Sequence, residues 1–130
     1  MSQENVEVVR DANAAGRRGD WNALAEMLDP HILIRADARW PEQRMYGREA
    51  ALAFYRDLWE SGGPDIRIEQ TTDLGDRVLV RLCWHMRGLS SGIEGEQRAS
   101  ALCTFREGRV ILEEFFLEHD QALKAVGLEE

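Results

Sequence analysis

The chain has 130 residues, a formal net charge of −8, 44% hydrophobic residues and 31% charged residues. This length suits one domain, which we expect to span residues 1–130 and to bury a core of its own. The acidic balance disfavours a nucleic-acid partner, which usually requires a basic patch, and it also disfavours binding to an anionic membrane surface.

Other features of the sequence also argue against a membrane or secreted protein. No apolar run approaches the roughly 20 residues that span a bilayer, and the N-terminal segment lacks a basic stretch followed by an apolar one. Cys83 and Cys103 fall on opposite faces of adjacent predicted strands, so we expect free thiols. Together these observations predict a cytoplasmic protein.

Three helices are predicted in the first half of the chain. Residues 4–17 carry apolar residues at helical spacing, and Asn13 interrupts that stripe. Gly19 followed by Asp20 is typical of a helix end and a new N-cap, so a second short helix should follow. A third helix is expected over residues 47–60. Its buried stripe is predicted to contain Ala51, Phe54, Tyr55, Leu58 and Trp59.

The strands are predicted mainly in the second half. A strand at residues 31–37 and another at 65–72 are accompanied by a very short one near 44–46. Residues 78–87 alternate strictly between the two faces, and residues 97–106 do the same with small side chains on the core side. Small residues on a core face leave space that a neighbour or a ligand must fill.

The turn around Gly108 decides which side chains of the last strand face inward. We favour a three-residue loop at 106–108, because a two-residue turn would force Glu107 to a positive φ. That register places Ile111 and Glu113 on the concave face. A two-residue turn would send Glu113 outward and bring Glu114 inward, and this alternative stays open.

The order of elements predicts an α+β fold. Three helices lie around one strand, and four strands then follow in succession. An antiparallel-rich, strongly curved sheet with helices on one face would enclose a conical cavity between the two layers. A short helical turn is expected after residue 120.

Several stretches resemble SnoaL-like proteins of the nuclear-transport-factor-two-like superfamily, which also contains ketosteroid isomerase and limonene epoxide hydrolase. The stretches are SQENVEVVRDANAAGRRGDWNALAEMLDP, GREAALAFYRDLW, RGLSSGIEGEQRASALCTFREGRVI and DQALKAVGL. The resemblance implies a cone-shaped α+β fold, the cystatin-like roll, with a pocket for a small and mostly apolar molecule. It also implies a homodimer formed through the outer face of the sheet.

The resemblance does not fix an activity, because one fold hosts many chemistries. The positions of the base and of the two oxyanion-stabilising groups of ketosteroid isomerase correspond here to Ala36, Ala12 and Cys103. None of these can do that work, so isomerisation of a ketosteroid is not expected. Asn13 and Gly16 stand where relatives commonly carry aromatic residues, which should enlarge the pocket.

The expected pocket combines large aromatic side chains on one wall with small residues on another. Asn13 has two readings, a polar group at the cavity wall or an amide bonded to nearby backbone. The predicted ligand-binding residues are Asn13, Tyr55, Trp59, Trp84, Met86, Ala101 and Cys103.

Glu113 is the leading candidate for a catalytic residue. A carboxylate among apolar neighbours is desolvated, which raises its pKa and makes it a better proton acceptor near neutral pH. Asn13 or Tyr55 would help through hydrogen bonds. The alternative is a structural ion pair between Glu113 and a basic residue such as Arg35.

Two function classes follow from these residues. One is a cofactor-independent isomerase, cyclase or hydrolase, and the other is a non-catalytic small-molecule-binding protein; a dimeric interaction module is a third option. The three histidines lack metal-ligand spacing, so neither a metal nor a cofactor is expected. A homodimer would cover apolar residues of the outer sheet face. These are Leu79, Cys83, Leu102, Leu112 and Phe116.

Overall fold

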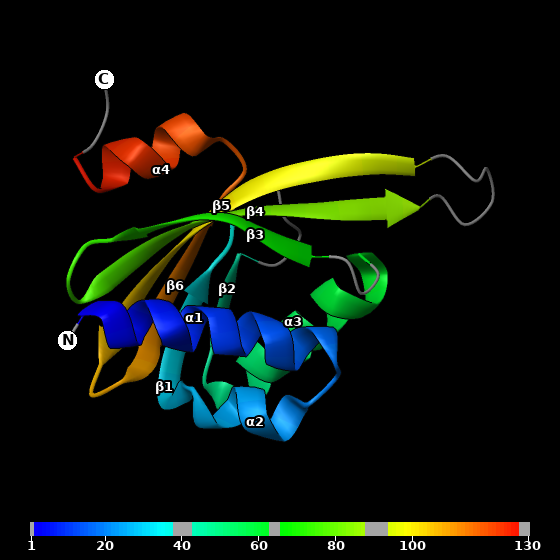
Figure 1. The fold of residues 1–130 in the computed structure, drawn as a ribbon. Coiled ribbons are helices and arrows are strands. Elements are labelled where there is room, and N and C mark those ends of the chain that lie inside the picture. Colours follow the sequence, from blue (N-terminus) through cyan, green and yellow to red (C-terminus); the bar gives the residue numbers. More distant parts are fainter. Residues whose placement is uncertain (1, 38–42, 63–65, 88–93, 128–130) are drawn as a thin grey trace.

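A computed structural model describes residues 2–37, 43–62, 66–87 and 94–127. The six strands form one curved sheet in the order β2-β1-β6-β5-β4-β3, with helices α1, α2 and α3 against its concave face (Figure 1). The α+β prediction is therefore confirmed. The elements are α1 (Ser2–Arg17), α2 (Trp21–Glu26), β1 (Leu28–Arg35), β2 (Arg44–Tyr46), α3 (Arg48–Gly62), β3 (Ile66–Asp73), β4 (Arg77–Arg87), β5 (Glu94–Arg106), β6 (Arg109–Phe116) and α4 (His119–Ala125).

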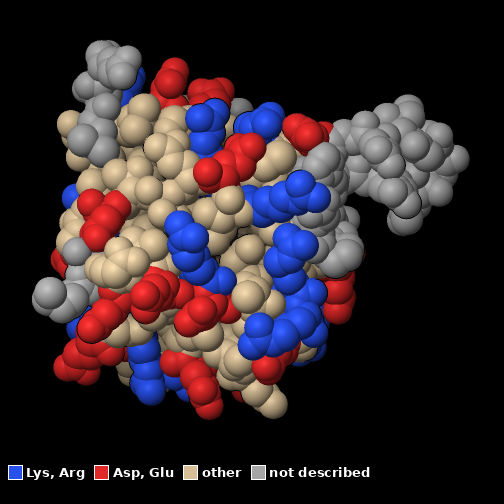
Figure 2. Space-filling model, viewed as in Figure 1, with Lys and Arg blue, Asp and Glu red and all other residues tan. Residues whose placement is uncertain are grey.

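The helices form where apolar residues recur every three or four positions. Val6 and Val9 of α1 are buried against the sheet, and Ala51, Tyr55 and Trp59 line the inner side of α3 at intervals of four. The outer side of these helices meets water. Figure 2 shows acidic and basic side chains mixed over the face that carries α1 and α2.

The predicted N-cap of the second helix is confirmed. The side chain of Asp20 accepts a hydrogen bond from the backbone N–H of Ala23 at 3.1 Å, which satisfies one of the free donors at the helix start. Leu24 is the buried residue of this short helix.

The first strand begins earlier than the sequence predicts. β1 starts at Leu28, which pairs with Val110 of the parallel neighbour β6, and the ladder shifts register before it resumes at Leu33. Pro30 lies inside this irregular stretch, where its missing N–H interrupts no regular ladder. The sequence pattern predicted a strand start at residue 31 because a local pattern cannot include the tertiary pairing with β6.

The turn between β5 and β6 differs from the predicted three-residue loop. Arg106 pairs directly with Arg109, so Glu107 and Gly108 form a two-residue turn, with φ of 53° and 79° respectively. Positive φ at both central residues is the geometry that matches the twist of two antiparallel strands. The strand twist therefore prevails over the unfavourable backbone conformation of Glu107.

A bulge then restores the predicted facing of the last strand. The ladder runs from Phe105 opposite Val110 to Thr104 opposite Leu112, so Ile111 is the extra residue. Val110, instead of Ile111, becomes buried on the concave face. Beyond the bulge Glu113 faces inward, as predicted, although the turn that leads to it is different.

The outer face of the sheet is partly covered by α4 (Figure 1). Leu79 and Leu102 are each 2% exposed and form a second small core with Ala122 of that helix, to which Phe116 also packs. From the sequence, we expect this apolar strip to be open to a second subunit. The C-terminal helix instead covers a large part of it within one chain.

Candidate functional site

A cavity of about 90 Å³ lies between the concave face of the sheet and the helices. Most of its wall is aliphatic or aromatic, and the polar side chains come from four residues, Asn13, Tyr55, Cys103 and Glu113, besides the indole of Trp59. The other lining residues are Val9, Ala12, Leu24, Leu28, Leu58, Ile66, Ile68, Val80, Leu82, Val110 and Phe115.

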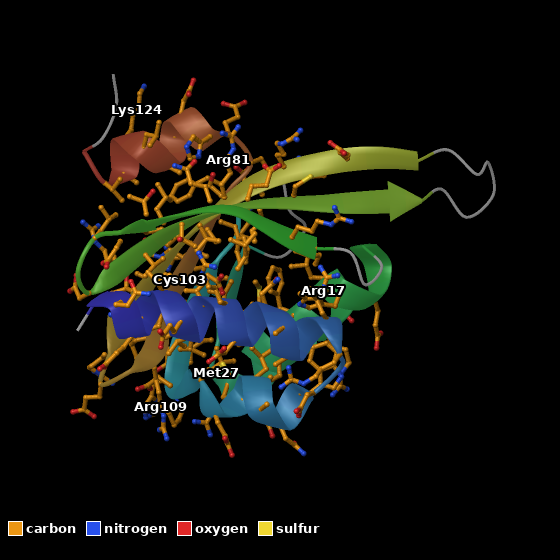
Figure 3. All side chains as sticks on the ribbon, in the orientation of Figure 1. Arg17, Met27, Arg81, Cys103, Arg109 and Lys124 are labelled. Atoms are coloured by element: carbon orange, nitrogen blue, oxygen red, sulfur yellow. The ribbon has the colours of Figure 1, made fainter. Side chains whose placement is uncertain are left out.

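Three elements bring the polar centre of this cavity together. Tyr55 comes from α3, Cys103 from β5 and Glu113 from β6, and Cys103 and Glu113 are direct cross-strand partners. Figure 3 shows Cys103 between the sheet and α1. Side chains of opposed residues on one face of an antiparallel pair lie within contact distance, so the bulge at Ile111 is what makes this meeting possible.

Each carboxylate oxygen of Glu113 accepts a hydrogen bond. The hydroxyl of Tyr55 donates to Oε1, and the thiol of Cys103 donates to Oε2 with a separation of 3.5 Å. A thiol is a weak donor, so the bond from Tyr55 is the stronger of the two. We name Glu113, Tyr55 and Cys103 together the Glu113 cluster.

Burial dominates the electrostatics of the Glu113 cluster. It raises the pKa of the Glu113 carboxyl above its ordinary value, and the hydrogen bonds from Tyr55 and Cys103 offset part of that rise. Burial, reinforced by the nearby charge of Glu113, also raises the pKa of Tyr55 and of Cys103 well above their ordinary values. Both groups therefore stay protonated near neutral pH, and Cys103 is a donor and not a thiolate nucleophile.

The expected alternative ion pair of Glu113 is not formed. Arg35 lies 3.7 Å from Glu114, measured from Nη1 to Oε2, while Glu113 bonds only to Tyr55 and Cys103 among the described residues. Alternation along β6 separates the two neighbouring glutamates, so that one carboxyl meets an arginine and the other meets a cavity.

Asn13 combines the two readings that its position in α1 left open. Its Nδ2 donates to the carbonyl oxygen of Ile66 in β3 at 3.3 Å, and the side chain also lines the cavity. Arg17, one turn further along the helix, donates to the same carbonyl at 3.1 Å. These bonds fasten α1 to the first residue of β3.

Gly16 does not enlarge the cavity, contrary to expectation. The indole of Trp59 from α3 occupies the space beside Gly16, and it would collide with any Cβ at that position. Trp59 itself lines the cavity and is 8% exposed. The absence of a side chain at Gly16 therefore makes room for a tryptophan and not directly for a ligand.

The remaining predicted pocket residues are placed as follows. Ala101 is 1% exposed, lies opposite Phe115 in the core and does not line the cavity. Trp84 and Met86 belong to β4 by their backbone, but their side chains lie outside the described part of the structure.

The sequence did not single out several lining residues, because their pattern is the same as that of ordinary core residues. Val9 and Leu24 belong to apolar helix stripes, and such stripes do not reveal which members border an empty space. Val110 was not predicted as a lining residue because no local sequence pattern predicts the bulge at Ile111. Phe115 lies two positions after Glu113 and shares its face by alternation, but it was not singled out as a lining residue.

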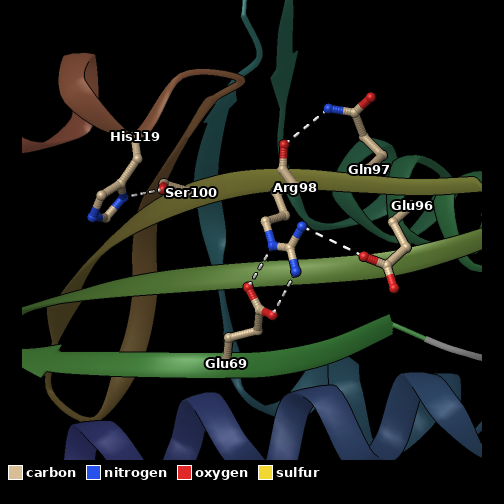
Figure 4. A network of polar contacts seen from close by, with 6 residues as sticks. All are labelled: Glu69, Glu96, Gln97, Arg98, Ser100 and His119. Carbon is tan, nitrogen blue, oxygen red and sulfur yellow. Dashed lines mark hydrogen bonds and ion pairs between the residues drawn. The ribbon is translucent and has the colours of Figure 1, made fainter.

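The histidines lie away from this cavity where they are described. His31 is exposed in β1, and the side chain of His85 lies outside the described part of the structure. His119 begins α4 on the outer side, with Nδ1 at 2.7 Å from the hydroxyl of Ser100 (Figure 4). Among the described residues, no group of three or more His, Cys, Asp or Glu side chains could hold a metal ion. In the same part of the chain, no helix is long and apolar enough to cross a membrane.

Three solved structures illustrate the similarity of the whole chain. Bal32a, from a soil-derived mobile gene cassette, has a TM-score of 0.76 at 23% identity, over 88% of both chains. A protein described as a SnoaL-like polyketide cyclase from Jannaschia sp. CCS1 has a TM-score of 0.74 at 23% identity, over 100% of this chain and 96% of the other. A protein with a ketosteroid isomerase-like fold from Catenulispora acidiphila, in complex with trimethylamine, has a TM-score of 0.72 at 17% identity, over 94% and 93%.

These likenesses establish the fold and leave the activity open, because each identity is below a quarter. A comparison with curated protein sequences gives no significant match. The family profile described as the SnoaL-like domain matches residues 9–113, which include Asn13, Tyr55, Cys103 and Glu113. The chain therefore belongs to the SnoaL-like domain family.

Proposed function

We propose that the cavity binds a small, mostly apolar molecule and that Glu113 transfers protons on it without a cofactor. The observation that carries the proposal is the Glu113 cluster: one carboxyl with a raised pKa, held by two donors, at the wall of an otherwise apolar cavity. A carboxyl whose pKa approaches the working pH is an effective general base and general acid.

The geometry supports one division of labour between the carboxyl oxygens of Glu113. Tyr55 holds Oε1, and the weak donor Cys103 leaves Oε2 the better acceptor for a substrate proton. In the proposed step a C–H bond next to a carbonyl breaks, its proton forms an O–H bond with Oε2, and the electron pair moves to the carbonyl oxygen. Return of that proton to another atom of the same molecule completes an isomerisation.

Tyr55 would stabilise the negative charge that develops on the substrate oxygen. Once Oε2 has taken the proton, Oε1 becomes the carbonyl oxygen of a neutral carboxylic acid and is a weaker acceptor for the phenol. The Tyr55 hydroxyl is then released to donate to the substrate oxygen. A donor aimed at developing charge in a water-poor site is worth considerably more than the same bond in water.

The size of the cavity limits the substrate. A cavity of about 150 Å³ holds benzene, so 90 Å³ corresponds by proportion to roughly four non-hydrogen atoms. A steroid or a polycyclic polyketide would require more space than this. Trimethylamine, the ligand of the Catenulispora relative, is in the size range that the proposal requires.

The alternative function is binding without turnover. Both carboxylate oxygens of Glu113 already accept hydrogen bonds within the protein. This arrangement is compatible with a purely structural role of the carboxyl as well as with a catalytic one. In that case the carboxyl would give the cavity a polar anchor for its ligand.

Exchange of carbon-bound protons distinguishes these functions without knowledge of the natural substrate. Acetone, which matches the cavity in size, is incubated with the protein in D₂O, and loss of the α-proton signal is followed by NMR. We expect catalysed exchange in the wild type and a loss of about 100-fold or more in Glu113→Gln, with ketone binding retained. Glu114→Gln is the matched control, since it removes a carboxyl that pairs with Arg35 on the other face.

The outcomes separate the proposals. Equal exchange in wild type and Glu113→Gln would refute the catalytic role. Binding of acetone without exchange in the wild type would favour the binding protein.

The homodimer and the cytoplasmic location remain predictions. Because α4 covers Leu79 and Leu102, a dimer would have to use the rest of the outer face, including Leu112 and the strand around Cys83. Sedimentation at micromolar concentration tests this, with twice 14.9 kDa expected. Both cysteines are free, which suits a reducing compartment.

A further inference from the structure

Helices α1 and α3 meet at a point where only glycine fits. A Cβ built on Gly16 would lie 2.9 Å from Cζ2 of the Trp59 indole and closer still to its Nε1 and Cε2 atoms. Real side chains do not tolerate such distances. Gly16 is buried in the helix without a positive φ, so its backbone conformation does not require glycine; the neighbouring indole does.

The same indole is part of the cavity wall. Trp59 is 8% exposed and borders the cavity together with Asn13 and Leu58. The space left for a ligand therefore depends on how far the ring can settle onto α1.

Helix α1 cannot easily withdraw to accommodate a larger residue at position 16. Asn13 and Arg17, on either side of Gly16, both donate to the carbonyl oxygen of Ile66, at 3.3 and 3.1 Å. Because the helix is fastened to β3 at these two points, a side chain at position 16 should displace the indole and not the helix. The empty space next to the indole is the cavity.

We propose that Gly16 and Trp59 act as a size selector for the ligand. Gly16 allows the indole to lie against α1, and the indole then limits the cavity to compact molecules of roughly four non-hydrogen atoms, by proportion to a benzene-sized cavity. This inference rests on ligand binding in the cavity of the proposed function, but it does not depend on proton transfer by Glu113.

The test is a series of neutral ketones of increasing size: acetone, cyclopentanone and 2-decalone. Binding is measured by ligand-observed NMR titration in the wild type, Gly16→Ala, Trp59→Leu and the double variant. Trp21→Leu is the matched control, because Trp21 stacks with Arg56 at 5.5 Å and does not line the cavity.

A size selector makes four specific demands on this series. Gly16→Ala should weaken acetone binding at least 10-fold, because the displaced ring takes up cavity space. Trp59→Leu should improve 2-decalone binding at least 10-fold relative to acetone. The double variant should match Trp59→Leu within about twofold, since the group that alanine would strike is gone. Trp21→Leu should keep the wild-type order of affinities.

The result can separate this inference from the proposed function. If the wild type binds no ketone but Trp59→Leu binds cyclopentanone, the selector stands and the proposed function fails for these ligands. If Gly16→Ala and Trp59→Leu keep the wild-type size preference, or if no variant binds any ketone, the selector is refuted.

Discussion

The polar side chains of β5 have different surroundings on the two faces of the sheet. On the concave face, the thiol of Cys103 contacts the carboxyl of Glu113 beside a cavity. On the outer face, Ser100 is fully buried and its hydroxyl lies 2.7 Å from Nδ1 of His119, under α4. Both polar groups have partners, and the inner one also borders the cavity.

The charges differ in the same way. Arg98 on the outer side of β5 is shared between Glu69 at 3.1 Å and Glu96 at 3.4 Å, and all three side chains reach water (Figure 4). Glu113 has no cationic partner among the described residues and lies partly buried at the cavity wall. A charged group in water carries little desolvation penalty, whereas burial of a carboxyl raises its pKa. A perturbed group beside an empty space is the better sign of function.

The largest expected effect on stability comes from a substitution in the outer face. Leu102→Ala removes a side chain that is 2% exposed in the small core under α4, and it should cost about 2–4 kcal/mol of unfolding free energy. Urea unfolding measures the loss. Ketone binding by the folded fraction should be unchanged, because Leu102 points away from the cavity; weakened binding there would show that the two faces are coupled.

The next expected effect concerns Glu113 on the inner face and depends on pH. The pKa of Glu113 is raised in the folded state, so between its ordinary value and that raised value the folded protein binds more protons than the unfolded chain. Stability from this group is fully present below the ordinary pKa and is lost as pH rises through the raised one, by at most about 1.4 kcal/mol per pH unit.

The variant Glu113→Gln should flatten this part of the stability curve. Urea unfolding is measured from pH 4 to pH 8 in wild type, Glu113→Gln and Glu114→Gln, and the last variant controls for loss of one carboxyl on β6. If Glu113→Gln and wild type lose stability in parallel over that range, the pKa of Glu113 is not raised in the folded protein.

A smaller effect is expected at the buried hydroxyl of the outer face. Ser100→Ala removes the partner of His119 and should cost about 0.5–1.5 kcal/mol, the usual range for a neutral hydrogen bond. Thermal unfolding followed by circular dichroism measures it. Proton exchange on ketones should stay at the wild-type rate, and a large loss of exchange would give this pair a role that its position does not suggest.

The smallest effect is expected in the exposed ion pairs. Arg98→Gln breaks contacts with Glu69 and Glu96 that are open to water and screened by salt, so the unfolding midpoint should not move measurably. A clear shift that disappears in high salt would show that this network stabilises the fold after all.

The sequence alone determined most of the local structure. The apolar stripes fixed the inner sides of α1 and α3, including Tyr55 and Trp59, because helical spacing repeats on one side of a cylinder. Strict alternation fixed which residues of β5 face inward, and Asp20 announced the start of α2. Each of these signals depends only on neighbours within a few positions.

Tertiary structure decided how those pieces meet. The twist of paired strands placed Glu107 at a positive φ, and the bulge at Ile111 returned Glu113 to the inner face. The parallel partner β6 extended β1 back to Leu28, and packing of α4 covered Leu102. None of these outcomes is encoded in a local period, because each depends on a partner strand or helix from elsewhere in the chain.

The candidate site divides along the same line. Local pattern placed Tyr55, Cys103 and Glu113 on inward faces, but only the assembled sheet and helix brought the phenol and the thiol to the two oxygens of one carboxyl. From the sequence, Gly16 was expected to enlarge the pocket. In the fold, the indole of Trp59 occupies the space beside Gly16. The period of a helix or strand fixes the direction of a side chain, whereas the volume around it is set by residues far away in the sequence.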